Sequence, residues 1–124
     1  MLGNQTLTAF VATADATRAK AFYGDVLGLE LTSEDPFAIV FRAANATVRV
    51  QKVTSLTPQP FTALGWAVDD IAAIAAALVQ RGVRLERYEG MGQDETGIWT
   101  SPGGARVAWF KDPDGNVLSV TQHP

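Results

Sequence analysis

Residues 15–28, DATRAKAFYGDVLG, and residues 69–82, DDIAAIAAALVQRG, share one pattern. Each stretch begins with aspartate, a residue type that commonly caps the first turn of a helix. Each then places apolar residues at helical spacing and ends on a glycine, where a helix commonly terminates. The apolar sets are Ala19, Phe22, Tyr23 and Val26 in the first stretch, and Ile71, Ile74, Ala75 and Leu78 in the second. Two equivalent helices are therefore predicted.

Alternation of apolar and polar residues predicts strands on both sides of each helix. In the first half the predicted strands are residues 6–13, a strand that opens with Leu29 and Leu31 and stops before the break at residues 34–36, and residues 37–42 and 47–53. In the second half they are residues 61–68, 83–88, 106–111 and 116–122. The order β-α-β-β-β thus occurs twice, which predicts an α+β fold made of tandem modules. We expect a single domain, residues 1–124, that consists of module 1–53, linker 54–60 and module 61–124.

Composition excludes several classes of protein. The chain of 124 residues has no cysteine, so disulfides, thiolate zinc sites and cysteine nucleophiles are excluded. No uninterrupted apolar stretch reaches about 18 residues, which predicts that no segment spans a membrane. The net charge of −3, without any basic cluster, argues against nucleic-acid binding. The first ten residues lack a basic region followed by an apolar run, so a cytoplasmic protein is expected.

Three motifs follow one another in the duplicated unit: DATRAKAFY at 15–23, GWAVDD at 65–70 and WFKDPDGN at 109–116. In this order they resemble the vicinal oxygen chelate superfamily, which includes glyoxalases, extradiol dioxygenases, fosfomycin-inactivating transferases and bleomycin-binding resistance proteins. The resemblance covers essentially the whole chain. It implies a curved mixed sheet with helices on its convex face, a cavity on the concave face, and a homodimer. Whether one chain or two would form the cavity stays open.

The resemblance also implies four positions for ligands of a divalent metal, on the first and last strands of each module. In this sequence they fall on Thr8, Arg49 (with Gln51 two residues further along the same face), Ala63 and Ser119. Neither Thr8 nor Ala63 is an ordinary ligand for a divalent metal, and an arginine at position 49 would repel a cation. The one histidine, His123, lies next to the last residue of the sequence and is expected to be a bystander. We therefore predict neither a metal nor another cofactor.

A small-molecule ligand is the expected partner. The predicted ligand-binding residues are Thr8, Phe10, Arg49, Gln51, Tyr88, Trp99, Trp109 and Ser119. Such a lining suits an aromatic or amphipathic molecule, with Arg49 as the partner of an anionic group. Two alternatives stay open: a register shift by one residue would turn Trp109 into the core, and Arg49 is equally well explained as a solvated charge. Trp66 is predicted to be structural.

The function predicted from these features is metal-free binding of a small molecule, with sequestration of a toxic compound as one role. One alternative is a lyase, isomerase, transferase or dioxygenase-like enzyme that uses Arg49, Glu86 or Tyr88 in the same cavity. Another is a structural or regulatory domain without turnover. Neither a serine–histidine pair nor a phosphate-binding loop occurs, so no catalytic residue is predicted. The glycine-rich segment 89–104 is predicted either as a functional loop or as a simple connection.

Overall fold

The computed structural model describes residues 1–124, which divide into two compact units, Met1–Pro58 and Gln59–Pro124. Each unit contains one four-stranded mixed sheet and a short helical segment. The α+β class and the tandem β-α-β-β-β modules are thereby confirmed. The strands form two separate hydrogen-bonded sheets, one in each unit.

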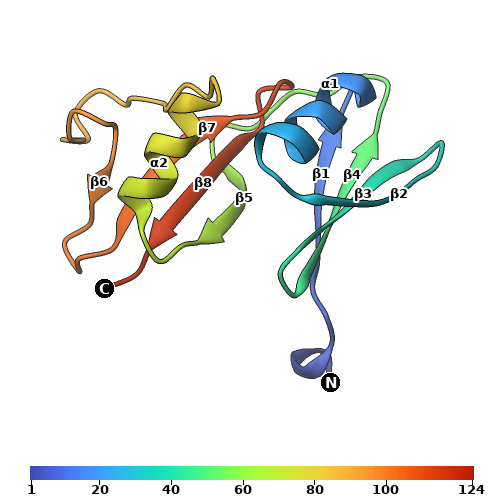
Figure 1. Ribbon diagram of the computed structural model, residues 1–124, viewed down its shortest axis with the longest axis horizontal. Coiled ribbons are helices and arrows are strands. Elements are labelled where there is room, and N and C mark those ends of the chain that lie inside the picture. The colour runs from blue at the N-terminus through green and yellow to red at the C-terminus, as the bar shows by residue number, and fades with distance from the viewer. The chain divides into compact units, whose positions relative to one another are not determined.

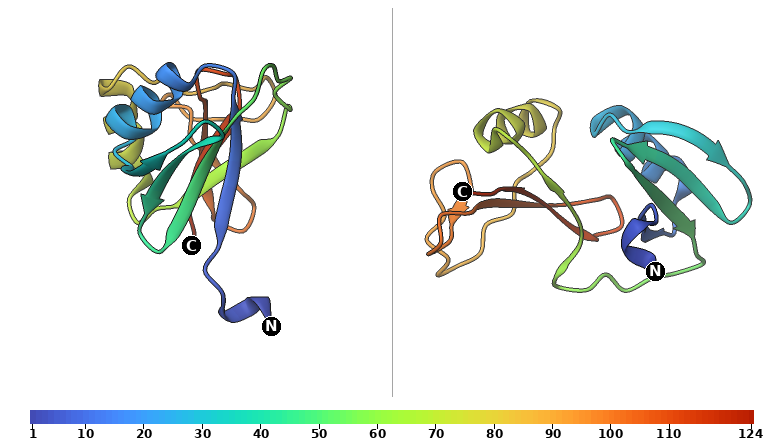
Figure 2. Two further views of the ribbon diagram at one scale, coloured as in Figure 1. Left: turned by 90° about the vertical axis from the view of Figure 1, so that its right-hand side faces the viewer. Right: turned by 90° about the horizontal axis from the view of Figure 1, so that it is seen from below.

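The sheet of the first unit has the strand order β1-β4-β3-β2. β1 pairs with β4 in parallel, and the other two pairings are antiparallel. The N-terminal residues that precede β1 extend away from this sheet (Figures 1 and 2). The elements are a 3₁₀ turn Leu2–Asn4, β1 Thr8–Thr13, α1 Ala16–Lys20, a π-helical segment Ala21–Val26, β2 Glu30–Glu34, β3 Ala38–Ala43 and β4 Ala46–Lys52.

The first predicted helix begins and ends where the sequence pattern places it. The Asp15 side chain caps it by accepting a hydrogen bond from the Arg18 N–H, and Gly28 follows it with a φ of 78°. Only its first turns are α-helical, because the chain continues as a π-helical segment from residue 21. The fully buried Tyr23 lies in this segment and packs on Phe41 of β3, with 6.1 Å between the ring centroids. The helix is thereby fixed to one face of the sheet.

The sheet of the second unit has the strand order β5-β8-β7-β6. Helix α2 lies on one face of it (Figure 2). Asp70 caps α2 by accepting from the Ala73 N–H, and the Ile71 N–H donates to Gln122 Oε1 at 2.9 Å, which joins the start of the helix to β8. The elements are β5 Thr62–Ala67, α2 Ile71–Gln80, β6 Trp99–Thr100, β7 Arg106–Lys111 and β8 Val117–Gln122.

One predicted strand of the second unit, residues 83–88, is not a strand. It forms a single bridge, between Leu85 and Phe110, beside which the Glu86 N–H donates to the Trp109 carbonyl at 2.7 Å. The chain then leaves this edge of β7 and returns to it as the two-residue strand β6, inside the segment predicted to be irregular. Two short pieces therefore share the edge that one strand was expected to cover.

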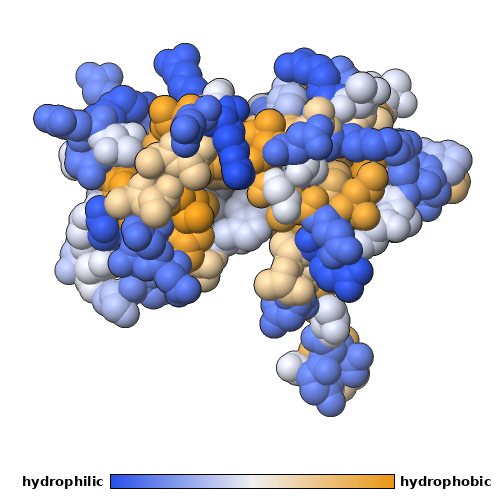
Figure 3. Space-filling model, in the orientation of Figure 1, coloured by the Kyte–Doolittle hydropathy of each residue, from blue (hydrophilic) through white to orange (hydrophobic).

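Both sides of α2 are apolar, because the helix consists mainly of alanine and branched aliphatic residues. Ile71, Ala75 and Leu78 are buried against the sheet, whereas Ile74 and Val79 remain exposed. Figure 3 shows apolar surface over this helix between more polar neighbours. With ten residues, α2 is the longest helix, and neither it nor any other helix meets the length and hydropathy of a membrane span.

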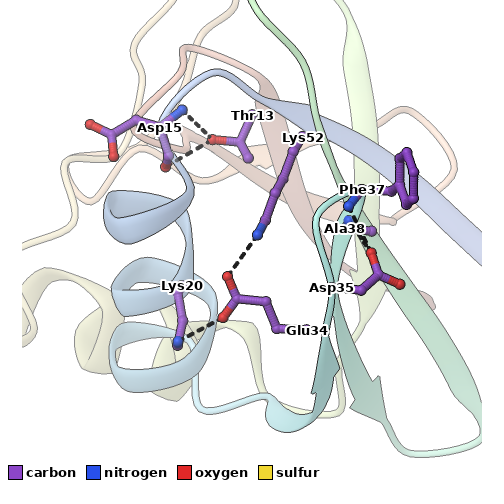
Figure 4. A network of polar contacts seen from close by, with 8 residues as sticks. All are labelled: Thr13, Asp15, Lys20, Glu34, Asp35, Phe37, Ala38 and Lys52. Carbon is purple, nitrogen blue, oxygen red and sulfur yellow. Dashed lines mark hydrogen bonds and ion pairs between the residues drawn. The ribbon is translucent and has the colours of Figure 1, made fainter.

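A polar network joins the helix of the first unit to its sheet (Figure 4). The Glu34 carboxylate at the end of β2 accepts from Lys20 Nζ at 2.7 Å and from Lys52 Nζ at 2.8 Å. These two hydrogen bonds lower the pKa of Glu34 from 4.5 to about 2, and the bond from Lys20 has the larger effect. Next to it, Asp35 accepts from the Phe37 and Ala38 N–H groups, which lowers the pKa of Asp35.

We predict that Glu34→Gln lowers the melting temperature at neutral pH, because the carboxylate is stabilised more in the folded than in the unfolded chain. A carboxyl group with a depressed folded-state pKa stabilises fully above its unfolded value of 4.5 and loses this effect as the pH falls towards 2. The difference between the two proteins should therefore shrink below pH 4.5. It should also shrink in high salt, because the network is exposed.

The matched control is Glu30→Gln, which removes a single exposed ion pair with Arg42 at 3.4 Å and should change the melting temperature less. Thermal unfolding followed by circular dichroism measures all three proteins. A Glu34→Gln effect that stays constant from neutral to acidic pH would contradict the role of the carboxylate charge.

Candidate functional site

Each sheet has a helical face and an opposite face, here called the non-helical face. In the second unit Phe110 and Val120 belong to the helical face, and Trp66 stacks on Phe110 with 6.5 Å between centroids and an interplanar angle of 17°. Trp66 is therefore a packing residue, as predicted. Because side chains alternate along a strand, Trp109 and Ser119 belong to the non-helical face.

A row of three residues crosses the non-helical face of the second sheet. Ser119 of β8 pairs with Gly65 of β5 on one side and with Trp109 of β7 on the other. The predicted position of Trp109 opposite Ser119 is thereby confirmed, and the register shift that would have placed Trp109 in the core does not occur. This row is the centre of the candidate site.

Three aromatic residues meet beside this row. The Tyr88 ring lies edge-on to Trp109 with centroids 5.6 Å apart, and the Trp99 ring lies at 6.0 Å from Trp109. Burial raises the pKa of the Tyr88 phenol, and the negative charge of Glu86 raises it further. Tyr88 nevertheless keeps 39% of its surface exposed, and both tryptophans are partly exposed. The cluster can therefore offer ring surface to a ligand.

The segment that supplies Tyr88 and Trp99 is held by its own polar contacts. Gln93 accepts from the Tyr88 N–H at 2.7 Å, and its amide donates to the carbonyls of Glu86 and Gly97. Asp94 accepts from three successive N–H groups, those of residues 96–98, and these bonds lower its pKa. Side-chain hydrogen bonds of Gln93 and Asp94 thus shape this segment, and both predictions for it, a functional loop and a simple connection, stay open.

The strand beside Ser119 offers a floor without large side chains. Ala63, Gly65 and Ala67 of β5 are all exposed and carry at most a methyl group. A Cβ added to Gly65 would lie 2.7 Å from Ser119 Oγ, so the serine side chain occupies the space over this glycine. The aromatic cluster therefore lies at the β7 end of the row. The small residues of β5, here called the floor, lie at the other end.

The non-helical face of the first sheet carries an equivalent row. Arg49 of β4 pairs with Phe10 of β1 on one side and with Val40 of β3 on the other. Thr8 and Gln51 lie on the same face, two residues from the row along β1 and β4. Phe10 is 58% exposed, and Arg49 is partly exposed and makes no ion pair or side-chain hydrogen bond. The positive charge of Arg49 contributes to the lowered pKa of Asp35.

The positions implied for metal ligands do not fit a divalent metal. Arg49 and Ser119 are the central residues of the two rows, Thr8 lies on β1, and Ala63 lies at an irregularity in the pairing of β5 with β8. Two hydroxyls, a methyl group and a guanidinium offer no strong donor for such an ion. No group of three or more histidine, cysteine, aspartate or glutamate side chains is arranged to hold a metal ion elsewhere.

Residues 5–120 match the family model of the Glyoxalase/Bleomycin resistance protein/Dioxygenase superfamily. The chain belongs to this superfamily. The resemblance inferred from the three motifs is thereby confirmed. No curated protein sequence matches the chain.

Solved structures of superfamily type share the fold. A superfamily member from Sphaerobacter thermophilus is 22% identical with a TM-score of 0.77, over 99% of this chain and 100% of that one. A lactoylglutathione lyase from Agrobacterium tumefaciens is 16% identical with a TM-score of 0.74, over 96% and 93%. TnmS3, an antibiotic binding protein from Streptomyces sp. CB03234, is 24% identical with a TM-score of 0.73, over 100% and 99%.

The eight residues predicted for ligand binding fall into two groups. Tyr88, Trp99, Trp109 and Ser119 lie in the second unit, and Thr8, Phe10, Arg49 and Gln51 lie in the first. Two contributors were missed, the floor residue Gly65 and the bracing residue Gln93. A glycine inside a strand pattern is a signal of close backbone approach and could have identified Gly65. No sequence signal distinguishes Gln93 from other polar loop residues.

We predict that Gly65→Ala destabilises the second unit by roughly 1–3 kcal/mol, because the new methyl group collides with Ser119 Oγ. Ser119→Ala removes that oxygen, so the double variant should be more stable than the sum of the single effects indicates. Urea unfolding of the wild type, both single variants and the double variant measures the coupling. Purely additive changes in the free energy of unfolding would contradict the close approach of Ser119 Oγ to position 65.

Proposed function

We propose that the protein binds a small aromatic or amphipathic molecule on the non-helical face of its second sheet, without a metal and without chemical conversion. The observation that supports this proposal best is the meeting of Tyr88, Trp99 and Trp109 around one exposed face. Rings at such distances stabilise a further ring by stacking or edge contact, typically about 0.5–1.5 kcal/mol for each pair. TnmS3, which has the same fold, is described as an antibiotic binding protein.

The polar groups beside the aromatic cluster favour binding over catalysis. Glu86 is paired with Lys111 at 3.6 Å. The raised pKa of the Tyr88 phenol keeps it protonated at neutral pH, so it donates hydrogen bonds but is a poor base. The phenol is therefore suited to donate a hydrogen bond to a bound molecule, and the Glu86 carboxylate is already engaged by Lys111. An enzyme of the glyoxalase or dioxygenase type stays the rival hypothesis for this site.

We predict that aromatic compounds quench the tryptophan fluorescence of the protein, and that Trp109→Ala weakens this binding at least about tenfold. Trp109 contacts both other rings, so its removal takes away the centre of the cluster. The matched control is Trp66→Phe, which removes the tryptophan of the helical face and should leave the dissociation constant unchanged. In that variant Trp99 and Trp109 are the only fluorescent indoles.

Two results would count against the proposal. One is unchanged fluorescence and melting temperature across a broad panel of aromatic compounds. The other is stoichiometric nickel, zinc, manganese or iron in purified protein, as measured by elemental analysis. Chromatography of each bound compound after prolonged incubation tests the rival hypothesis, since a new product would show turnover.

For the first sheet we propose a separate role, in which Arg49 binds an anionic group next to the exposed ring of Phe10. Thr8 and Gln51 lie on the same face and can donate further hydrogen bonds to an oxyanion. A guanidinium that makes no ion pair or side-chain hydrogen bond in the chain is able to form two parallel hydrogen bonds with a carboxylate. The charge of Asp35 limits the attraction, but two backbone N–H groups already bind that carboxylate.

We predict that Arg49→Gln weakens the binding of naphthoate about tenfold and leaves the binding of naphthalenemethanol unchanged, because only the carboxylate uses the charge. The matched control is Arg42→Gln, which removes a more exposed arginine of the same sheet and should change neither affinity. Equal losses for the acid and the alcohol would show that the substitution disturbs the sheet rather than charge recognition.

A further inference from the structure

The Ser119 side chain is buried, and its hydroxyl has no hydrogen-bond partner within the chain. The residue is 8% exposed, and no hydrogen bond within the chain engages its hydroxyl. No buried side-chain polar atom of the chain is left unsatisfied, so this hydroxyl must open to the surface. Because Trp109 and Gly65 flank Ser119 on the non-helical face, the opening is towards the candidate site.

The surroundings of this hydroxyl determine the shape of a molecule that can reach it. Gly65 and Ala67 carry no side chain larger than methyl, so a flat molecule that lies against β5 meets the Ser119 side chain over Gly65 rather than a side chain of β5 itself. The ring of Trp109 limits the same space at the opposite side of Ser119. A planar molecule on this floor would displace solvent from the hydroxyl and leave it without a hydrogen bond, unless the molecule itself supplies one.

The type of polar atom follows from the chemistry of a hydroxyl. It has one proton to donate and two lone pairs that accept. In folded proteins a donor without an acceptor is rarer than an acceptor with unused lone pairs. The least favourable ligand is therefore one whose edge has no hydrogen-bond acceptor for the Ser119 proton.

We infer that the ligand is a planar aromatic compound with a hydrogen-bond acceptor at its edge, a ring nitrogen or a carbonyl oxygen, to which Ser119 Oγ donates. This inference rests on the function proposed for the aromatic face and specifies the ligand class for it. Trp109, Trp99 and Tyr88 supply the ring contacts, and Ser119 selects for the acceptor. A position that the superfamily resemblance assigns to a metal ligand is thus used to recognise the organic molecule directly.

The test compares quinoline with naphthalene, two fused rings of nearly equal shape that differ in one acceptor nitrogen. Their dissociation constants are measured by fluorescence at neutral pH for the wild type, Ser119→Ala and Thr121→Val. The last variant is the control, because it removes the neighbouring hydroxyl of the same strand face. Melting temperatures verify that all three proteins are folded.

The wild type and Thr121→Val should prefer quinoline about fivefold or more, which corresponds to one net hydrogen bond. Ser119→Ala should lose the preference and bind naphthalene as well as the wild type does. Equal affinities of the wild type for both compounds would overturn the inference while leaving the proposed function intact. So would a preference that survives in Ser119→Ala, or an equal loss for both compounds. If neither compound binds to the wild type while other aromatic compounds of the panel do, this inference fails and the proposed function stands; if no compound of the panel binds, both fail.

Discussion

The close approach of β5 to β8 is the constraint on which the candidate site depends. Ser119 Oγ occupies the space that a Cβ at position 65 would need, so the serine side chain has to shift when any larger residue replaces the glycine. The parallel register of β5 with β8 sets Ser119 opposite Gly65, and the antiparallel register of β7 with β8 sets it opposite Trp109. A shift by one residue would move the serine and the tryptophan to the helical face and dissolve the row. The small residues of β5, the Ser119 hydroxyl and the aromatic cluster therefore depend on the two registers in which β8 pairs.

The duplicated module uses the same geometry for two different chemistries. In the first sheet the row is Phe10, Arg49 and Val40, with the aromatic residue on the outer strand and a charge at the centre. In the second sheet the aromatic residue is on β7, the centre is a hydroxyl and the outer strand is bare. Duplication thus preserves the positions but not the residue types. Both central residues stand where the superfamily resemblance implies metal ligands, and neither suits a cation.

Local signals explain most of what was predictable from the sequence. Asp15, Asp70, Gly28 and Gly82 act through the backbone of their own helix, so their roles follow from nearby residues alone. Alternation likewise predicted that Trp109 and Ser119 share a face. The short pairing around Leu85 was not predictable, because it depends on where the chain leaves the edge of β7. The meeting of Trp99 with Trp109 depends on Gln93 and Asp94, whose hydrogen bonds shape the connection.

The indole N–H signals of the three tryptophans, observed by nuclear magnetic resonance during titration with quinoline, test the central claim most directly. Each tryptophan gives one signal, and single substitutions assign them. The account predicts that the signals of Trp99 and Trp109 shift together and saturate while that of Trp66 stays in place, since Trp66 belongs to the helical face. A shift confined to Trp66, or no shift at saturating concentrations, would contradict the assignment of ligand binding to the non-helical face.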